Sequence, residues 1–261
     1  MCNQTKKQKT KTKTKNTLGQ AFKKSNPTDA VMAYENAIQL LTDAGRLTQA
    51  AKLCKECAEM YENDEVQIDA SASSSNSSNN KSPVVLAIEM YQQAAELFEL
   101  EDSKSQASTC QSKIAELCSA ALDPPDLIRA STIYDQLGRK CLENNLLKFN
   151  AKGYFLQSIL CLLAAGDGIG AEQQYTRYES LDYTYGDSRE GKFAKQIIDC
   201  VEQYDMETFA TCCYEYDRIS KLDPWKTSML VKVKRNIGDE TGGTGGGGGD
   251  GTGGEDDFDL T

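Results

Sequence analysis

The sequence lacks histidine altogether, although the chain has 261 residues. Histidine is the commonest general base and a common metal ligand, so its absence excludes the usual centre of acid–base catalysis and of many zinc sites. Tryptophan occurs only once, and no apolar run is long enough to cross a bilayer. We therefore expect any membrane contact to be peripheral.

Basic residues are fewer than acidic ones: the sequence has 29 lysines and arginines and 39 aspartates and glutamates, which gives a net charge of −10. An acidic chain is a poor match for a phosphate backbone, so nucleic acid is not expected as a partner. No signal peptide precedes the ten cysteines. Their number therefore indicates reduced thiols in the cytosol rather than a disulfide framework.

Cys54 and Cys57 have the spacing of a zinc-ligand pair, but the sequence offers neither a second such pair nor a histidine. Both cysteines fall within an amphipathic helical pattern, so we expect packed thiols and no metal or other cofactor. The glycine-rich run 243–254 lacks the Gly-Lys-Ser/Thr ending of a phosphate-binding loop. These absences argue against an enzyme, and a cysteine-based redox protein is the enzymatic alternative.

A helical repeat organises the chain. The segment Asp29–Tyr61 predicts two amphipathic helices joined at 43–46, where Gly45 can adopt the positive φ that ends the first helix. An alanine followed four residues later by a tyrosine recurs at Ala30/Tyr34, Ala87/Tyr91, Ala130/Tyr134, Ala171/Tyr175 and Ala210/Tyr214. A second alanine follows the first three pairs by about twenty residues, at Ala51, Ala107 and Ala151.

A period near forty residues with two helices in each repeat is typical of tetratricopeptide-like α-solenoids. We therefore predict an all-α solenoid of helical hairpins that ends in a small C-terminal helical bundle. The expected regions are a disordered basic leader at 1–17, hairpin repeats over 18–204 with an inserted flexible loop at 63–82, the bundle at 205–237, and a glycine-rich acidic tail at 238–261. The leader is either a basic arm for acidic lipid or protein or a merely solvated segment, and its lack of an amphipathic period favours the latter.

Several separate segments, in the same order, resemble the soluble NSF attachment protein family, where NSF is an AAA+ ATPase. They are Gln20–Lys52, Leu146–Cys161, Gly186–Glu190 and Tyr216–Ile237. The ending Glu255–Thr261, an acidic run with a penultimate leucine, resembles that of the α/β branch. The resemblance implies an adaptor without catalytic activity that coats an assembled SNARE four-helix bundle and recruits the ATPase that takes the bundle apart.

The resemblance also implies the site residues. The basic positions that face the SNARE bundle in the family match Lys23, Lys24, Arg46, Lys52, Lys113 and Lys152, while one further position is Thr109 here. The positions that face the ATPase match Asp167, Asp199, Glu202, Glu255, Asp256, Asp257 and Leu260, and Gln203 replaces another acidic residue. Lys52 and Lys152 each follow a repeat alanine, so they are expected to project from equivalent faces of two hairpins.

The sequence departs from the family where the Lys/Thr-rich leader stands in place of the first hairpins and their apolar membrane loop. We therefore expect a truncated or mispredicted start, and a weakened peripheral attachment of this cytoplasmic protein to membranes. The Ser/Asn-rich loop and the length of the glycine spacer are further departures. The competing function is a generic tetratricopeptide scaffold, which would hold other protein partners in a groove lined by lysine and asparagine.

Overall fold

The computed structural model describes residues 27–63 and 81–242. Within those ranges every regular element is an α-helix, which confirms the all-α prediction. The helices are α2 (Pro27–Asp43), α3 (Leu47–Glu62), α4 (Pro83–Leu100), α5 (Lys104–Ala120), α6 (Leu127–Leu142), α7 (Lys148–Ala164), α8 (Gly168–Leu181), α9 (Arg189–Glu202), α10 (Met206–Ile219) and α11 (Pro224–Gly242). The predicted leader, most of the inserted loop and the acidic ending lie outside the described residues.

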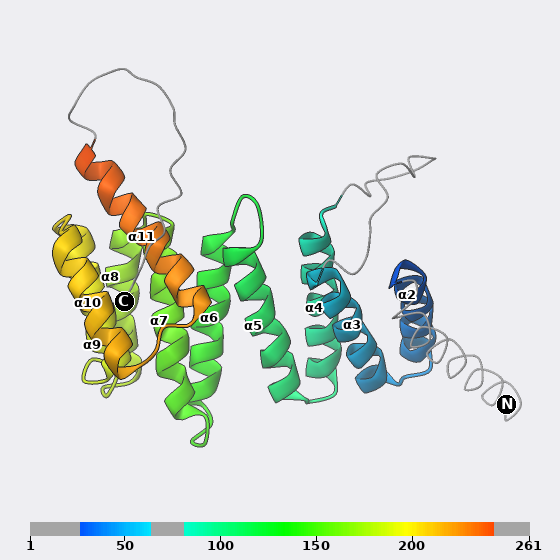
Figure 1. Ribbon diagram of the computed structural model, residues 1–261. Coiled ribbons are helices and arrows are strands. Elements are labelled where there is room, and N and C mark those ends of the chain that lie inside the picture. Colours follow the sequence, from blue (N-terminus) through cyan, green and yellow to red (C-terminus); the bar gives the residue numbers. More distant parts are fainter. Residues whose placement is uncertain (1–26, 64–80, 243–261) are drawn as a thin grey trace, which may run out of the picture. The chain divides into compact units, whose positions relative to one another are not determined.

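The chain forms two compact units, Met1–Asp126 and Leu127–Thr261. In the first unit the described helices form two hairpins, α2–α3 and α4–α5, and α3 also packs on α4. In the second unit the hairpins α6–α7 and α8–α9 are followed by α10 and α11 (Figure 1). No helix of the described ranges is long and apolar enough to span a membrane.

The repeated alanine–tyrosine pair lies in the core of four hairpins. The alanines have no exposed surface, and their tyrosines are at most 6% exposed: Ala30/Tyr34, Ala87/Tyr91, Ala130/Tyr134 and Ala171/Tyr175. The second-helix alanines Ala51, Ala107 and Ala151 are buried in the same way. Because alanine has only a methyl group, the two helices of a hairpin can approach closely, and the tyrosine ring fills the space beside the contact.

The fifth pair does not belong to this core, although it matches the other four in spacing. Ala210 is exposed and Tyr214 is 52% exposed, although both lie on α10. The buried side chains of α10 are instead those of Phe209, Cys212, Cys213 and Tyr216. The physical reason is the position of α11, which packs mainly on α7 and touches α10 only slightly.

None of the cysteines of the described ranges is in a disulfide, and all of them are buried. Burial raises the pKa of the Cys54 thiol to about 12, so the thiolate that reacts with oxidants or binds metal is scarce at neutral pH. Cys57 is also fully buried. Both residues therefore act as small apolar side chains in the core of α3.

Four turns between helices share one geometry. The second residue after the helix has a positive φ at Gly45 (68°), Asp102 (55°), Gly166 (81°) and Tyr204 (55°). Each turn closes with the paired backbone hydrogen bonds of a Schellman motif; at Gly166, for example, the next residue's amide donates to Leu162 O at 3.0 Å. Two of these positions are not glycine, so glycine alone would have identified only half of the turns.

A buried polar network joins the helices of the second unit. The hydroxyl groups of Ser131 on α6 and Ser158 on α7 lie 2.9 Å apart, and Tyr178 on α8 donates to Ser158 Oγ at 2.9 Å. The Phe155 ring stacks on Tyr178 with ring centroids 3.9 Å apart. That ring lies so close to Gly138 that an added Cβ would come within 2.4 Å of it, so α6 requires a glycine there.

Helix α11 closes the second unit. Its Trp225 meets Tyr134 of α6 edge-on, with ring centroids 5.4 Å apart. Its Asn236 donates to the carbonyl oxygens of Leu163 and Ala164, both at 3.1 Å, and so satisfies two acceptors at the end of α7. The helix continues to Gly242, five residues beyond Ile237, where we expected it to end.

Replacing Gly166 with alanine is expected to lower the free energy of unfolding by about 1 kcal/mol or more, because its φ of 81° disfavours any side chain. An added Cβ would meet nothing within 4 Å, so the cost is conformational rather than steric. Gly153→Ala, inside α7, also meets open space but should stabilise by roughly 0.5–1 kcal/mol. Urea unfolding followed by circular dichroism measures both, and a loss of stability in both variants would contradict the assignment.

Candidate functional site

Arg46 and Lys52 present positive charge from α3 of the first unit. Arg46 is the residue before the helix and is partly exposed, while Lys52 lies one and a half turns further along and is exposed. Neither side chain forms an ion pair within 27–63 or 81–242, so both charges are available to an acidic partner. Water screens such charges, and each pair formed with a partner is therefore worth little by itself.

Lys113 of α5 differs, because its charge is engaged within the fold. Its Nζ forms ion pairs with Glu62 at 3.0 Å and with Glu116 at 3.2 Å. Glu62, the last residue of α3, also accepts a 2.7 Å hydrogen bond from the Tyr91 hydroxyl of α4. Lys113 thus joins three helices. Burial alone would lower the pKa of Lys113, but the hydrogen bonds with the two glutamates outweigh it and raise the pKa.

Lys52 and Lys113 lie far apart along the direction of α3. Glu62, which holds Lys113, is ten residues beyond Lys52, a distance of about 15 Å at the usual helical rise. Lys52 and Lys113 therefore do not form one compact cluster. Any single acidic surface that contacts both has to extend along the hairpin, as a long rod would.

Lys152 lies in the first turns of α7 in the second unit and is partly buried. Its Nζ donates to the carbonyl oxygen of Thr184 at 3.3 Å, in the loop between α8 and α9. No carboxylate pairs with Lys152 in the part of the chain that the structure describes. Although Lys152 and Lys52 hold equivalent places after a repeat alanine, only Lys52 is fully exposed.

An exposed apolar loop precedes Lys152, and it was not among the residues predicted from the sequence. In the turn between α6 and α7, Leu146 is 90% exposed and Leu147 41%, and Phe149 at the start of α7 is 83% exposed. Large apolar side chains grouped on a surface commonly mark a contact with protein or membrane. The signal in the sequence was present, since these residues fall outside the spacing that buries the face of α7.

The acidic positions lie at helix ends in the second unit. Asp167 precedes α8 and accepts a 2.8 Å hydrogen bond from the Gly170 amide. Lys195 bridges Asp199 and Glu172, each at 3.0 Å; burial opposes the charge of Lys195, but these hydrogen bonds raise its pKa. Glu202 is the last residue of α9, is exposed, and forms no ion pair within the described residues.

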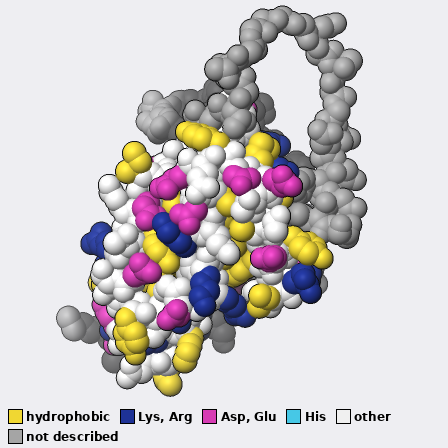
Figure 2. All heavy atoms as spheres, turned by 90° about the vertical axis from the view of Figure 1, so that its left-hand side faces the viewer, with side chains coloured by type: hydrophobic (Ala, Val, Ile, Leu, Met, Phe, Trp, Pro, Cys, Tyr) yellow, Lys and Arg dark blue, Asp and Glu magenta, His cyan; other side chains and the backbone are white. Residues whose placement is uncertain are grey.

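Carboxylates at the C-terminal end of a helix are unfavourable, because the carbonyl dipoles there are already negative. Asp199 and Glu202 are three residues apart in the last turn of α9 and so share a face. Helix stability does not explain this pair. Figure 2 shows the side of the molecule on which α9 and α10 lie, with acidic and basic side chains interspersed with hydrophobic ones.

The structure therefore gathers part of the expected site. Arg46, Lys52 and Lys113 lie in the first unit, whereas Lys152, Asp167, Asp199 and Glu202 lie in the second. The remaining expected residues lie outside the described ranges: Lys23, Lys24, Glu255, Asp256, Asp257 and Leu260. No group of three or more acidic or cysteine side chains within the described ranges is arranged to hold a metal ion.

Comparison with known proteins gives one consistent family. A family described as "Soluble NSF attachment protein, SNAP" matches residues 2–238. The chain is 34% identical to the alpha-soluble NSF attachment protein of Mus musculus, over 85% of this chain and 69% of that protein. It is also 34% identical to the beta-soluble NSF attachment protein of Bos taurus, over 87% and 70%, and to the alpha-soluble NSF attachment protein of Saccharomyces cerevisiae, over 85% and 71%.

The contacts of the two lysines predict different effects on stability. Lys113→Ala removes the ion pair with Glu62, which keeps only its hydrogen bond from Tyr91. The free energy of unfolding should fall by about 1 kcal/mol, a small value because the Lys113–Glu62 pair is partly exposed. Lys52→Ala breaks no ion pair and should change stability by less than about 0.5 kcal/mol. Thermal or urea unfolding distinguishes the two, and equal stabilities would show that Lys113 has no structural role.

Proposed function

Because the chain belongs to the soluble NSF attachment protein family, we propose that it is an adaptor that binds assembled SNARE complexes. It recruits and stimulates an NSF-type AAA+ ATPase, which then takes the SNARE bundle apart during vesicle fusion and transport. The adaptor has no catalytic activity of its own. A further relative, from Coprinopsis cinerea, is named a vesicular-fusion protein and is 32% identical over 85% of this chain, which supports the same role.

The observation that carries the proposal, besides the family, is the exposed charge on α3. Arg46 and Lys52 have no ion pair within the described residues, although the chain as a whole is acidic. Basic side chains in such a chain suit an acidic partner, whose approach they accelerate through long-range attraction. A SNARE bundle is a long rod, which matches basic positions spread along a hairpin rather than gathered in a pocket.

The exposed loop before α7 supplies the second kind of contact. Leu146 and Phe149 offer apolar surface beside the positive charge of Lys152. Apolar anchors contribute binding energy that salt does not screen, whereas lysines mainly set orientation and rate. We assign the loop and Lys152 to the SNARE contact, together with Lys23, Lys24, Arg46, Lys52 and Lys113.

We assign the ATPase contact to the negatively charged residues. Asp167, Asp199 and Glu202 provide carboxylates at helix ends of the second unit, two of them on one face of α9. The acidic ending adds Glu255, Asp256, Asp257 and the apolar side chain of Leu260. We place the protein in the cytoplasm, where it reaches membranes peripherally through its cargo.

Reversing the charge of Lys52 and Lys152 together is expected to weaken capture of an assembled SNARE complex at least tenfold near physiological salt. Each change removes an attraction and adds a repulsion, worth together somewhat more than about 1.4 kcal/mol. The measurement is retention of the protein by an immobilised SNARE complex at low and at physiological salt, with circular dichroism as the check on folding.

The matched control is Lys104→Glu with Lys221→Glu. These side chains are 86% and 85% exposed, one in each unit, and the change in net charge is the same. Capture by the control should stay within about twofold of the unchanged protein. Similar losses in both double variants would mean that net charge, and not this surface, governs SNARE binding.

Leu260→Ala is expected to keep SNARE binding and at least part of ATPase recruitment, because the carboxylates remain. Stimulation of ATP hydrolysis and of bundle disassembly should fall at least tenfold, as when an anchoring side chain worth a couple of kcal/mol is truncated. A disassembly assay with the ATPase and a labelled SNARE complex measures this. If the variant disassembled bundles at the unchanged rate, the role proposed for Leu260 would be wrong and the tail would serve only to keep the protein soluble.

A further inference from the structure

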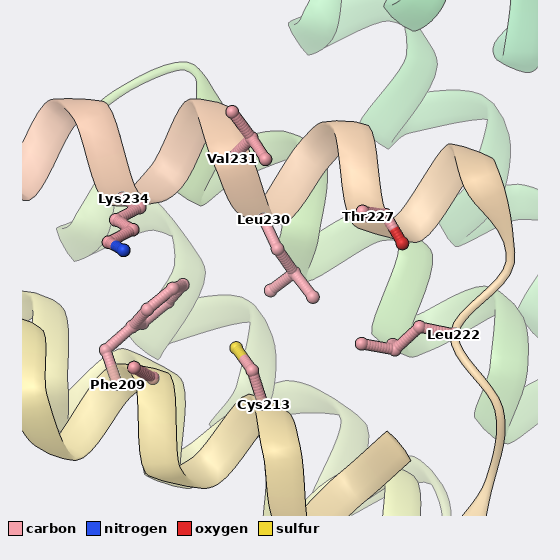
Figure 3. Close-up of a pocket in the computed structure, with 8 residues that line it drawn as sticks. Phe209, Cys213, Leu222, Thr227, Leu230, Val231 and Lys234 are labelled. Atoms are coloured by element: carbon pink, nitrogen blue, oxygen red, sulfur yellow. The ribbon is translucent and has the colours of Figure 1, made fainter. Parts of the chain in front are cut away.

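A small apolar hollow lies between α10 and α11. It has a volume of about 30 Å³ and is lined by Phe209, Ala210, Cys213, Leu222, Thr227, Leu230, Val231 and Lys234. In Figure 3, Leu230 points from α11 toward Cys213 of α10, and Phe209 points toward Lys234. The volume is that of roughly one water molecule in the liquid. It suits the tip of an aliphatic side chain rather than a whole ring.

The hollow lies where the repeated pattern of buried alanines is interrupted. In the hairpins α2–α3 and α6–α7 a buried alanine of the second helix follows the alanine of the first by 21 residues, as Ala51 follows Ala30 and Ala151 follows Ala130. The residue 21 positions after Ala210 is Val231. Val231 is only partly buried, and Ala210, whose counterparts are buried in the other hairpins, is exposed on α10.

A wider hollow adjoins the first along α11. It has a volume of about 540 Å³ and shares Leu222, Thr227 and Val231 with the smaller one. Two cationic side chains, Lys232 and Arg235, lie at its edge. Burial lowers the pKa of Lys232, which means that water solvates its ammonium group poorly. A carboxylate brought to this place would therefore be attracted more strongly than by a fully exposed lysine.

The two hollows together fit a short segment that carries both apolar and acidic side chains. We propose that their occupant is the acidic ending of the same chain, Glu255–Thr261. This segment has four carboxylates around Phe258 and Leu260. Leu260 enters the small hollow, Phe258 lies in the wide one, and the carboxylates approach Lys232, Lys234 and Arg235. Val231 lines both hollows and so lies between them. In an extended segment Phe258 and Leu260 point to the same side, so one side chain can enter each hollow.

The length of the chain permits this docking. The wide hollow, at Thr227, lies fifteen residues before the end of α11 at Gly242, a distance of about 22 Å along the helix. Fifteen residues, mostly glycine, separate Gly242 from Phe258. A coil of that composition has a root-mean-square span of about 20 Å. The tail can therefore fold back onto its own helix without extension.

Docking of this kind would keep the tail on the second unit until another acceptor competes for it. The apparent affinity of the tail for any partner falls by the fraction of molecules in which the tail is free. A partner that removes the tail also uncovers the apolar face between α10 and α11. Tail engagement and exposure of that face would then be coupled, and each would favour the other.

The test is a photo-crosslink in the full-length chain. Phe258→p-benzoylphenylalanine, irradiated at low protein concentration, should crosslink within the same chain to residues 209–235, as located by mass spectrometry of the monomer. Adding Ala210→Glu, which puts a carboxylate in the small hollow at an exposed position, should reduce the yield at least fivefold. Thr211→Glu, on the same helix and also exposed but outside the hollow, should leave the yield within twofold.

The natural side chains give an independent readout. Phe258→Ala with Leu260→Ala should speed amide hydrogen exchange at residues 209–213 of α10 and 227–235 of α11 at least threefold, because it uncovers them. Crosslinks located elsewhere, crosslinks found only in covalent dimers, equal yields with Ala210→Glu, or unchanged exchange would each overturn the proposal. The experiment uses neither SNAREs nor the ATPase, so its failure would leave the proposed adaptor function standing.

Discussion

The fold depends on the close contact between two helix backbones at a buried pair of alanines. Ala30 and Ala51, like Ala130 and Ala151, are fully buried in hairpins whose two helices pack together, and a methyl group allows helix backbones to approach closely. The tyrosine four residues after the first alanine then fills the space beside it. Because a closely packed interior transmits any change of volume, this contact fixes the spacing of each hairpin and with it the positions of the residues on its outer faces.

The surface charges show how neighbours decide the role of a side chain. Lys52 and Lys113 are both lysines on second helices of their hairpins, yet Lys113 is held by Glu62 and Glu116 whereas Lys52 faces solvent. The same contrast separates Asp199, paired with Lys195, from Glu202 at the end of α9. A partner that binds Lys113 or Asp199 has to compete with the ion pair that the residue already forms. Lys52 and Glu202, which form no such pair within the described residues, therefore contribute more to recognition.

Much of the fold could be predicted from the sequence, because helix periodicity is local and the alanine–tyrosine spacing repeats. The limits were contacts that depend on tertiary structure. Ala210 and Tyr214 match the repeat in spacing, but whether they are buried depends on where α11 packs. The ion pair of Lys113 with Glu62 joins residues 51 positions apart. The turns at Asp102 and Tyr204 lacked the glycine that marked the turns at Gly45 and Gly166. The exposed Leu146 and Phe149 fall outside the apolar spacing of α7, but their exposure depends on which neighbours pack around the turn.

The end of the repeat follows from the same contact that builds it. A hairpin array needs a last helix whose outer face is not covered by another repeat. Here α11 covers the end of α7, where Asn236 caps two carbonyl groups and Trp225 reaches Tyr134, rather than the alanine face of α10. The array therefore ends where the last helix packs on α7 instead of α10, and an apolar surface edged with positive charge is left between α10 and α11.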